Sequence, residues 1–558
     1  MPLERPSARR VATLALALLA LSLGVASVGR RAQAGGDPSL DALRRRLEDD
    51  DPAARAAAVR RLAATVGGSA GPGVDGEPAL RLVIHALADP HPYVRRAAGG
   101  VLGGVIAVPL RTRLLKEIPS WKDPLSRAEA AETFAAWADR DGRTGLLRLL
   151  ADKDAPVRAA AAEALADDSD EATAHALLLA TSDPDGEVRA TALESLLGGP
   201  SLERPGPHAL RGVGRAQGGA GGRANAGGGG GAGGAGGGGG RGSRGGVEIP
   251  LRALSKDRDE RVRLTALEGS VAAGGEAAVF AVEHGLDDAV WSVRLVAAEL
   301  AGTVRDRRVL APLVGELRDP RDRVAGAAGA ALVRLTGIPF DADPVRWKSW
   351  LEAEGASFDP ATVEPKRTSG FDAGGKTVAS VKFLELPLAS SHVTFVLDAS
   401  GSMATADAAG VSRWDRVRAE LDRVLGTLGT SAEGNIVLFS DEATTLFPSA
   451  VRFSPAVREK VAKALAGRPP AGKTALYDGI AKALEDPVVD AVVVLSDGAP
   501  SAGRWFTKTD VREELAKANR WRRARIDVIS IGTDEVAKRW RSLLRDLAED
   551  HGGRCVGP

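Results

Sequence analysis

Three oxygen-bearing side chains occupy alternate positions in the segment HVTFVLDASGSM. Asp398, Ser400 and Ser402 follow an apolar run that is typical of a buried strand. Aspartate and serine in this arrangement build turns and helix caps, and their oxygens are also the ligands that hard divalent cations take. The pattern alone therefore leaves open whether this is a turn or a metal site.

The elements that must position these residues belong to an alternation of predicted strands and helices in the last third of the chain. Such an alternation predicts a parallel sheet with helices on both faces, which explains why the segment AVVVLS is apolar without alternating. The segment SVKFLELPL is expected to add an edge strand. The predicted strands, in chain order, are 392–397, 435–439, 444–447, 491–495, 526–531 and 554–556.

In sheets of this kind, ligands bind beyond the carboxyl ends of the strands, at the point where the strand order reverses. With the order 3-2-1-4-5-6, the first and fourth strands flank that point. The first strand ends at Asp398, and the fourth ends at Asp497 in VVVLSDGAP. We therefore expect two carboxylates from distant parts of the sequence to meet in one crevice.

The set Asp398, Ser400, Ser402, Thr474 (in GKTALYDG) and Asp497 resembles the metal-ion-dependent adhesion site of von Willebrand factor type A (VWA) domains. The resemblance implies that the three hydroxyls bind Mg²⁺ or Mn²⁺ directly and that the two carboxylates act largely through water. It also implies that an acidic side chain of a partner protein completes the metal's ligand shell. The implied activity is protein binding without catalysis.

Two alternatives stand beside this interpretation. In the first, the chain is a metal-free scaffold of the cell envelope, and the same residues only cap helices and turns. In the second, GRPPAGKT (residues 467–474) is a phosphate-binding loop of a nucleotidase. Against the second, a predicted helix precedes this segment where a strand is needed, and Pro469 and Pro470 have no N–H to offer a phosphate.

The middle of the chain, about residues 37–353, repeats one helical pattern. DKDAPVRAAAAEAL and DPDGEVRATALESL begin 31 residues apart, and the same interval recurs at Asp257, Asp288 and Asp319. This period predicts an all-α solenoid of helix pairs, and the units resemble HEAT-like repeats of the phycobilisome-lyase type, which implies a protein-binding surface. The repeated aspartate is expected to accept the free N–H groups of the helix's first turn.

In most repeats an arginine directly follows the recurring valine, so that these arginines occupy the same position in each repeat. We expect a ladder that pairs these arginines with the aspartates of neighbouring repeats, in preference to a basic stripe for phosphates, because the net charge is near zero. They are Arg95, Arg158, Arg189, Arg263 and Arg294.

One interval in the repeat is too long. From Asp183 to Asp257 there are 74 residues, 43 more than one repeat. The excess is placed at residues 212–246, a glycine-rich tract expected to be a flexible insertion within one repeat. The segment VEIPLRALSKD is then expected to be that repeat's second helix, and residues 354–375 a linker.

The composition and the first residues of the chain narrow the expected location and partners of the protein. Lysine plus arginine (74) nearly cancel aspartate plus glutamate (73), so nucleic acid is not expected as a partner. Residues 1–34 combine a basic start, an apolar run and a small-residue site, as in a signal peptide or retained anchor. An exported protein is expected, periplasmic, envelope-bound or secreted, which touches a membrane only if this segment is retained.

Two smaller features have ordinary interpretations. Cys555 and His551 could form a nucleophile and its base, but a packed thiol is the simpler expectation because no third group orients them. The basic segment RWRRARID is expected to be a solvated helix end. Together the sequence predicts an exported, multidomain adaptor: an all-α solenoid, then a doubly wound α/β VWA domain with a mainly parallel sheet over residues 376–558.

Overall fold

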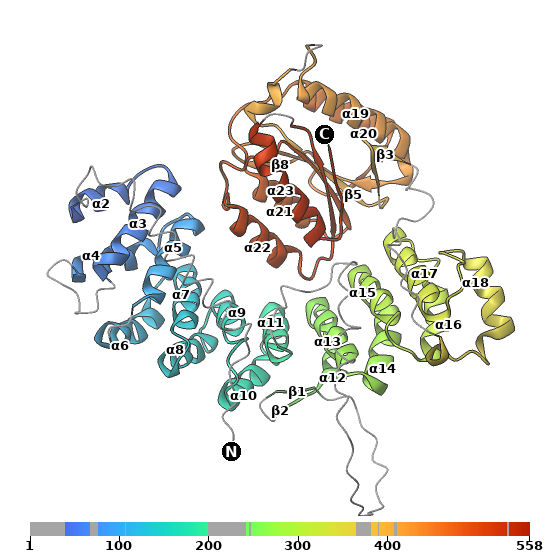
Figure 1. The fold of residues 1–558 in the computed structure, drawn as a ribbon, viewed down its shortest axis with the longest axis horizontal. Coiled ribbons are helices and arrows are strands. Elements are labelled where there is room, and N and C mark those ends of the chain that lie inside the picture. The colour runs from blue at the N-terminus through green and yellow to red at the C-terminus, as the bar shows by residue number, and fades with distance from the viewer. Residues whose placement is uncertain are drawn as a thin grey trace, which may run out of the picture. The chain divides into compact units, whose positions relative to one another are not determined.

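The structure, a computed structural model, has two compact units, Met1–Ile118 and Pro119–Pro558. Figure 1 shows helices along the first two thirds of the chain and a sheet with helices in the last third. The described residues are 39–66, 76–105, 108–198, 242–244, 247–363, 381–388, 390–406, 410–532 and 535–557.

The first unit is helical throughout its described residues. Arg55 pairs with Asp89 at 2.8 Å and so links one helix pair to the next. Its helices are α2 (Leu40–Arg46), α3 (Pro52–Val66), α4 (Gly76–Ala86), α5 (Pro92–Gly103) and α6 (Val108–Glu117).

The second unit continues with helix pairs and ends them on an aromatic cluster. Trp347 is fully buried and meets Trp350 edge to face, with 5.6 Å between ring centroids. The two tryptophans thus close the apolar core of the last repeats. The helices are α7 (Pro124–Trp137), α8 (Arg140–Leu150), α9 (Ala155–Ala164), α10 (Glu171–Ala180), α11 (Gly186–Leu196), α12 (Leu251–Leu254), α13 (Glu260–Ala273), α14 (Gly275–Leu286), α15 (Trp291–Ala301), α16 (Leu310–Glu316), α17 (Asp322–Thr336) and α18 (Pro344–Trp350).

The predicted arginine ladder is present. Arg158 donates through Nε and Nη2 to the two carboxylate oxygens of Asp183, at 2.7 and 2.8 Å, and through Nη1 to the carbonyl of Asp152. Its donors are therefore used inside the solenoid, which leaves no basic stripe for phosphates. The other rungs are Arg189–Asp257, Arg263–Asp288 and Arg294–Asp319, while Arg95 donates to the carbonyls of Asp89 and Pro90.

The capping role expected for the repeated aspartate holds at Asp123, which accepts the amides of Leu125 and Ser126, but not at Asp183. The side chain of Asp183 accepts the backbone amide of Asp185, at 2.9 Å, and Asp185 is the residue just ahead of α11. Asp185 is the cap itself, since its side chain accepts the amides of Glu187 and Val188. The repeated aspartate is turned instead toward the arginine of the preceding repeat, whose charge holds the pKa of Asp183 below its usual value against the opposing effect of burial.

The ladder continues across the long interval. Arg189 and Asp257 lie 68 residues apart in sequence, whereas Arg158 and Asp183 lie 25 apart. The difference, 68 − 25 = 43, equals the excess of the interval from Asp183 to Asp257 over one repeat. Most of residues 212–246 lies outside the described part of the chain, as does the predicted linker beyond residue 363.

The helix expected over VEIPLRALSKD begins late. Strand β2 (Val247–Ile249) pairs antiparallel with β1 (Gly242–Arg244), and α12 starts only at Leu251. Pro250 explains this difference, because the residue before a proline is driven to extended conformations and proline cannot donate to a helix already under way.

The α/β domain has the predicted strand order. Its central sheet runs β12-β11-β10-β5-β7-β8, and every neighbouring pair is parallel except β7 with β8. Helices α19 and α20 pack on one face, and α21, α22 and α23 on the other (Figure 1). The strands are β5 (Val393–Asp398), β7 (Ile436–Phe439), β8 (Ala443–Thr445), β10 (Ala491–Ser496), β11 (Arg525–Ser530) and β12 (Cys555–Val556). The helices are α19 (Arg413–Leu428), α20 (Pro455–Ala466), α21 (Leu476–Leu484), α22 (Lys508–Asn519) and α23 (Glu535–Asp550).

The edge strand expected from SVKFLELPL is wrong. This segment forms its own hairpin, β3 (Lys382–Phe383) with β4 (Leu386–Pro387), outside the central sheet. The two turn residues, Leu384 and Glu385, have positive φ, so the chain reverses before it can extend along the sheet. A second small pair, β6 (Glu433–Gly434) with β9 (Val451–Arg452), also lies apart.

The solenoid contacts the amino ends of the central strands. Arg323, in the first turn of α17, donates to the carbonyls of Asp490 and Arg523, at 2.6 and 2.7 Å. Asp490 directly precedes β10, and Arg523 lies two residues ahead of β11. Asp322 accepts the amide and hydroxyl of Ser391, just ahead of β5, at 3.2 and 2.9 Å. The first turn of α17 thus holds the chain just ahead of three parallel strands.

The basic segment RWRRARID is not solvated as expected. Arg520 pairs with the buried Glu194 of α11 at 3.3 Å, and Arg523 pairs with Glu268 of α13. Trp521 lies under the guanidinium of Arg520, with 3.6 Å to the ring centroid. This helix end is therefore a docking segment for acidic side chains of the chain's own solenoid, a role that charge composition alone did not reveal.

Candidate functional site

Asp398 lies at the carboxyl end of β5 and is completely buried. One carboxylate oxygen accepts the amide of Ser400 at 2.9 Å, and the other accepts the hydroxyl of Ser496 at 2.6 Å. Burial and the nearby charge of Asp497 raise the pKa of Asp398 to about 6. The two carboxylates therefore meet near one point, as the strand order predicted.

The two serines place their hydroxyls side by side. The Oγ atoms of Ser400 and Ser402 lie 3.1 Å apart, with Ser400 buried and Ser402 exposed. Two neighbouring ligands of an octahedral Mg²⁺ lie about 3.0 Å apart, because each is about 2.1 Å from the ion. The spacing thus fits a divalent cation that is bound by both hydroxyls.

The loop that carries Thr474 is tied by backbone bonds to the loop that carries the serines. The amide of Gly401 donates to the carbonyl of Gly472, and the amide of Ala471 donates to the carbonyl of Ala399, at 3.0 and 2.9 Å. Thr474 is buried, and its amide donates to the hydroxyl of Ser501. These bonds fix the backbone of Thr474 beside the serines.

Asp497 follows β10 and has a charged partner that the sequence did not suggest. Its Oδ2 accepts Nη1 of Arg413 at 3.0 Å, and both side chains are largely buried. Ser496, which holds Asp398, was also missed. A signal existed for each: Ser496 directly precedes Asp497, and Arg413 is a cation at a helix start, where the helix dipole disfavours positive charge.

The donor set suits a hard cation only if the hydroxyls take part. Among the described residues, no group of three or more His, Cys, Asp or Glu side chains could hold a metal ion. The candidate site has two carboxylates and must draw its other ligands from Ser400, Ser402, Thr474 and water. Such a set fits Mg²⁺ or Mn²⁺, which prefer oxygen, better than a nitrogen- or sulfur-seeking metal.

The family comparison agrees with this arrangement. The profile described as "von Willebrand factor type A domain" matches residues 392–556. Residues 392–556 are a VWA domain. The profile described as "HEAT repeats" matches residues 110–197, so the solenoid is HEAT-like in that part. Both are protein-interaction domains, and VWA domains commonly bind a divalent metal.

Several solved structures are similar to the chain. BatB from Bacteroides thetaiotaomicron is 18% identical, with 30% of this chain and 89% of that chain covered and a TM-score of 0.23. An aerotolerance-related membrane protein from Bacteroides fragilis is 16% identical, with 30% and 90% covered and a TM-score of 0.23. A VWA protein from Catenulispora acidiphila is 22% identical, with 31% and 40% covered and a TM-score of 0.25. Comparison with curated proteins gives no match.

The geometry of residues 467–474 does not suit a phosphate-binding loop. Gly467 caps the end of α20, so a helix precedes the segment where such a loop needs a strand. The loop amides are already engaged: Ala471 donates to Ala399, Lys473 to Asp441, and Thr474 to Ser501. They are thus turned toward protein acceptors and away from any shared phosphate.

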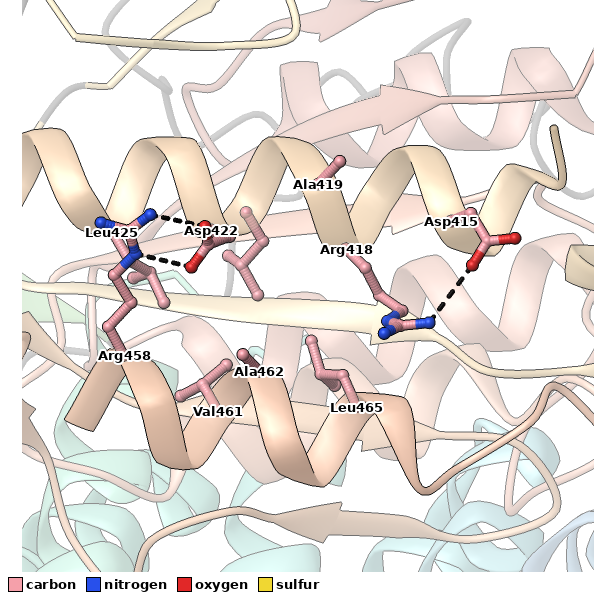
Figure 2. A pocket seen from close by; sticks show the side chains of 10 residues that line it. Asp415, Arg418, Ala419, Asp422, Leu425, Arg458, Val461, Ala462 and Leu465 are labelled. Atoms are coloured by element: carbon pink, nitrogen blue, oxygen red, sulfur yellow. Dashed lines mark hydrogen bonds and ion pairs between the residues drawn. The ribbon is translucent and has the colours of Figure 1, made fainter. Parts of the chain in front are cut away.

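A cavity of about 290 Å³ lies elsewhere in the VWA domain, between α19 and α20. Figure 2 shows its apolar floor, with Leu425, Val461 and Leu465, and its ion pairs, Asp415–Arg418 at 3.2 Å and Asp422–Arg458. None of the five predicted site residues lines it. The candidate site therefore lies apart from this cavity.

His551 and Cys555 do not form a nucleophile and base. Cys555 is half-buried in β12, and burial raises the pKa of its thiol. The amide oxygen of Asn519 accepts the amide of Ala524, so its nitrogen must donate to Nδ1 of His551, at 3.1 Å. This acceptor role keeps His551 neutral, and burial lowers its pKa to about 4.

We expect His551 to make the VWA domain less stable in mild acid. Its pKa falls from 6.5 in the unfolded chain to about 4 in the fold, so below pH 6.5 the unfolded chain binds a proton that the folded chain refuses. The free energy of unfolding should drop by about 3 kcal/mol between pH 6.5 and 4. Urea unfolding at pH 7 and pH 4.5 checks this.

His551→Gln should remove most of that pH-dependent loss, whereas the matched change His284→Gln, at an exposed position of α14, should leave it unchanged. Equal pH dependence in His551→Gln and the native protein would contradict the assignment.

Proposed function

We propose that this chain is a protein-binding adaptor whose VWA domain binds Mg²⁺ or Mn²⁺ and, through it, an acidic side chain of a partner protein. The hydroxyls of Ser400, Ser402 and Thr474 would bind the ion directly, while Asp398 and Asp497 would hold its waters. The ion would offer an open coordination position that a carboxylate of the partner can occupy.

The observation that carries this proposal is the spacing of the serine hydroxyls over a buried carboxylate. Ser400 and Ser402 present oxygens 3.1 Å apart, and Asp398 beneath them is held by Ser496. A role as a turn alone leaves the burial of Asp398 next to Asp497 unexplained, because Arg413 offsets only one of the two charges and a second buried carboxylate destabilises a fold that binds no further cation there.

The proposed location is outside the cytoplasm, with no catalytic activity. The targeting segment, residues 1–34, lies outside the described residues. Within the part that the structure describes, no helix is both long and apolar enough to span a bilayer. Part of the solenoid surface is used by the chain's own VWA domain, so a second partner would bind to other faces of the repeats.

Replacing Thr474 with Val tests the metal site with little change in shape. Calorimetric titration of the full chain with Mg²⁺, and separately with Mn²⁺, should give saturable binding in the native protein. Thr474→Val should weaken it by about tenfold or more, because one ligand oxygen is lost. Thr445→Val, at an exposed position of β8, is the matched control and should bind like the native protein.

Absence of binding by the native protein would overturn the proposal and favour the metal-free scaffold. Partner capture from cell-envelope extract, compared with and without EDTA, then tests the second half. Proteins retained in Mg²⁺ and released by EDTA should also be lost with Asp398→Ala.

A further inference from the structure

Backbone bonds of the residues just ahead of α19 position Arg413 at the candidate metal site. Its amide donates to the carbonyl of Thr405 at 3.0 Å, and Ala406 and Ser412 form an antiparallel bridge. Ser412 caps the helix by accepting the amide of Asp415. The backbone of Arg413 is therefore fixed at the mouth of the crevice, and the guanidinium reaches Asp497.

The placement of this cation runs against local helix preference. A positive charge in the first turn of a helix is disfavoured by the helix dipole. The first-turn carboxylate that could compensate, Asp415, is bound by the hydroxyl of Ser412 and by Arg418. Asp497 is the anion that receives Arg413 at 3.0 Å, with the arginine side chain only 13% exposed. The ion pair with Asp497 thus offsets the unfavourable position of Arg413 at the start of α19.

The charges of the site give this contact a consequence. Asp398 and Asp497 carry two negative charges when ionised, which a divalent ion would balance. Arg413 adds one positive charge directly on Asp497, where it repels an incoming cation and engages an oxygen that would otherwise hold the ion's water. Arg413 also leaves a loaded site with a net positive charge, which suits an acidic ligand.

We propose that Arg413 is a tethered cation that competes with the divalent metal for Asp497 and sets the metal affinity of the site to a low value. This inference rests on the proposed function, because it concerns the same site. It assigns to Arg413 a regulatory role toward the ion: the guanidinium must leave Asp497, or share it, whenever the ion is bound.

Arg413→Gln is the test, with Arg418→Gln as its control. Both changes remove one positive charge from the first turns of α19, but Arg418 pairs with Asp415 and not with Asp497. In Mg²⁺ calorimetry on the full chain, Arg413→Gln should bind about tenfold tighter or more. Arg418→Gln should bind within about twofold of the native protein, and Arg413→Lys should stay close to native because it keeps the charge.

The outcomes separate this inference from the proposed function. Native binding with equal or weaker binding by Arg413→Gln overturns the role of Arg413 and leaves the metal site standing. No binding by either protein overturns both. Binding by Arg413→Gln alone overturns the proposed function of the native chain, while it supports the competition of Arg413 with the metal. Thermal melts without metal show whether each variant is folded. If Arg413→Gln unfolds, Arg413→Met is the deciding variant, because it also removes the charge: it should bind Mg²⁺ tighter than the native protein, and native affinity would overturn the proposal.

Discussion

Asp398→Asn should abolish Mg²⁺ binding and, at the same time, make the metal-free protein more stable. The carboxyl is completely buried beside Asp497, and its pKa is raised from 3.8 to about 6. Above pH 6 the folded chain must carry an ionised group that the fold disfavours, at a cost of about 3 kcal/mol. Asparagine keeps an oxygen for the amide of Ser400 and carries no charge.

The pH dependence gives this expectation its sign. Below about pH 4 the carboxyl is protonated in both the folded and the unfolded chain, so Asp398→Asn and the native protein should unfold alike there. Between pH 4 and 6 the native protein loses stability relative to the variant, and the difference is complete above pH 6. Thermal melts in EDTA at pH 4, 5 and 7.5 measure it.

Glu442→Gln, at an exposed position between β7 and β8, is the control for the loss of one negative charge and should change neither property. A variant Asp398→Asn that is less stable at pH 7.5, or that still binds Mg²⁺ with native affinity, would contradict the assignment of Asp398 as a carboxylate kept for the metal at a cost to the fold.

Arg323→Ala should have the largest effect on stability. Arg323 joins the solenoid to the VWA domain by donating to the carbonyls of Asp490 and Arg523. Burial raises the pKa of Asp490, and the charge of Arg323 opposes that rise. Removing the arginine leaves a completely buried carboxylate short of a compensating charge, which should cost about 3 kcal/mol.

Scanning calorimetry of the full chain checks this effect. The native solenoid from α7 onward and the VWA domain should unfold together, and Arg323→Ala should separate them into two transitions. Adding Asp490→Asn should restore much of the loss, because it removes the charge that lacks compensation. Arg318→Ala, on the exposed surface of the same repeat, should be neutral; a variant Arg323→Ala that unfolds like Arg318→Ala would show that the junction depends on other contacts.

The strand order and the arginine ladder could be predicted because both depend on local, repeated patterns. An apolar run that ends in Asp398, and another that ends in Asp497, suffice to place two strands once the fold class is known. A ladder of Arg158 with Asp183 follows from a fixed phase in each repeat. These features need no knowledge of how distant segments meet.

The predictions that failed concern segments whose structure is determined by a single residue or by one contact with a distant part of the chain. A single proline, Pro250, turned an expected helix start into a strand, and two residues with positive φ, Leu384 and Glu385, made a hairpin from an expected edge strand. RWRRARID looked like a solvated helix end because its acidic partners, such as Glu194, lie hundreds of residues away. In the candidate site, Arg413 was missed for the same reason: its partner Asp497 is 84 residues distant in sequence.

The solenoid is bonded to Ser391, just ahead of β5, and the candidate site begins at Asp398, the last residue of β5. About 20 Å of strand, six residues at about 3.3 Å each, separates the two attachments. A tether pulled between a ligand and the helical repeats would therefore load the parallel strands lengthwise, in shear, so that many backbone bonds would have to rupture at once before the sheet gave way.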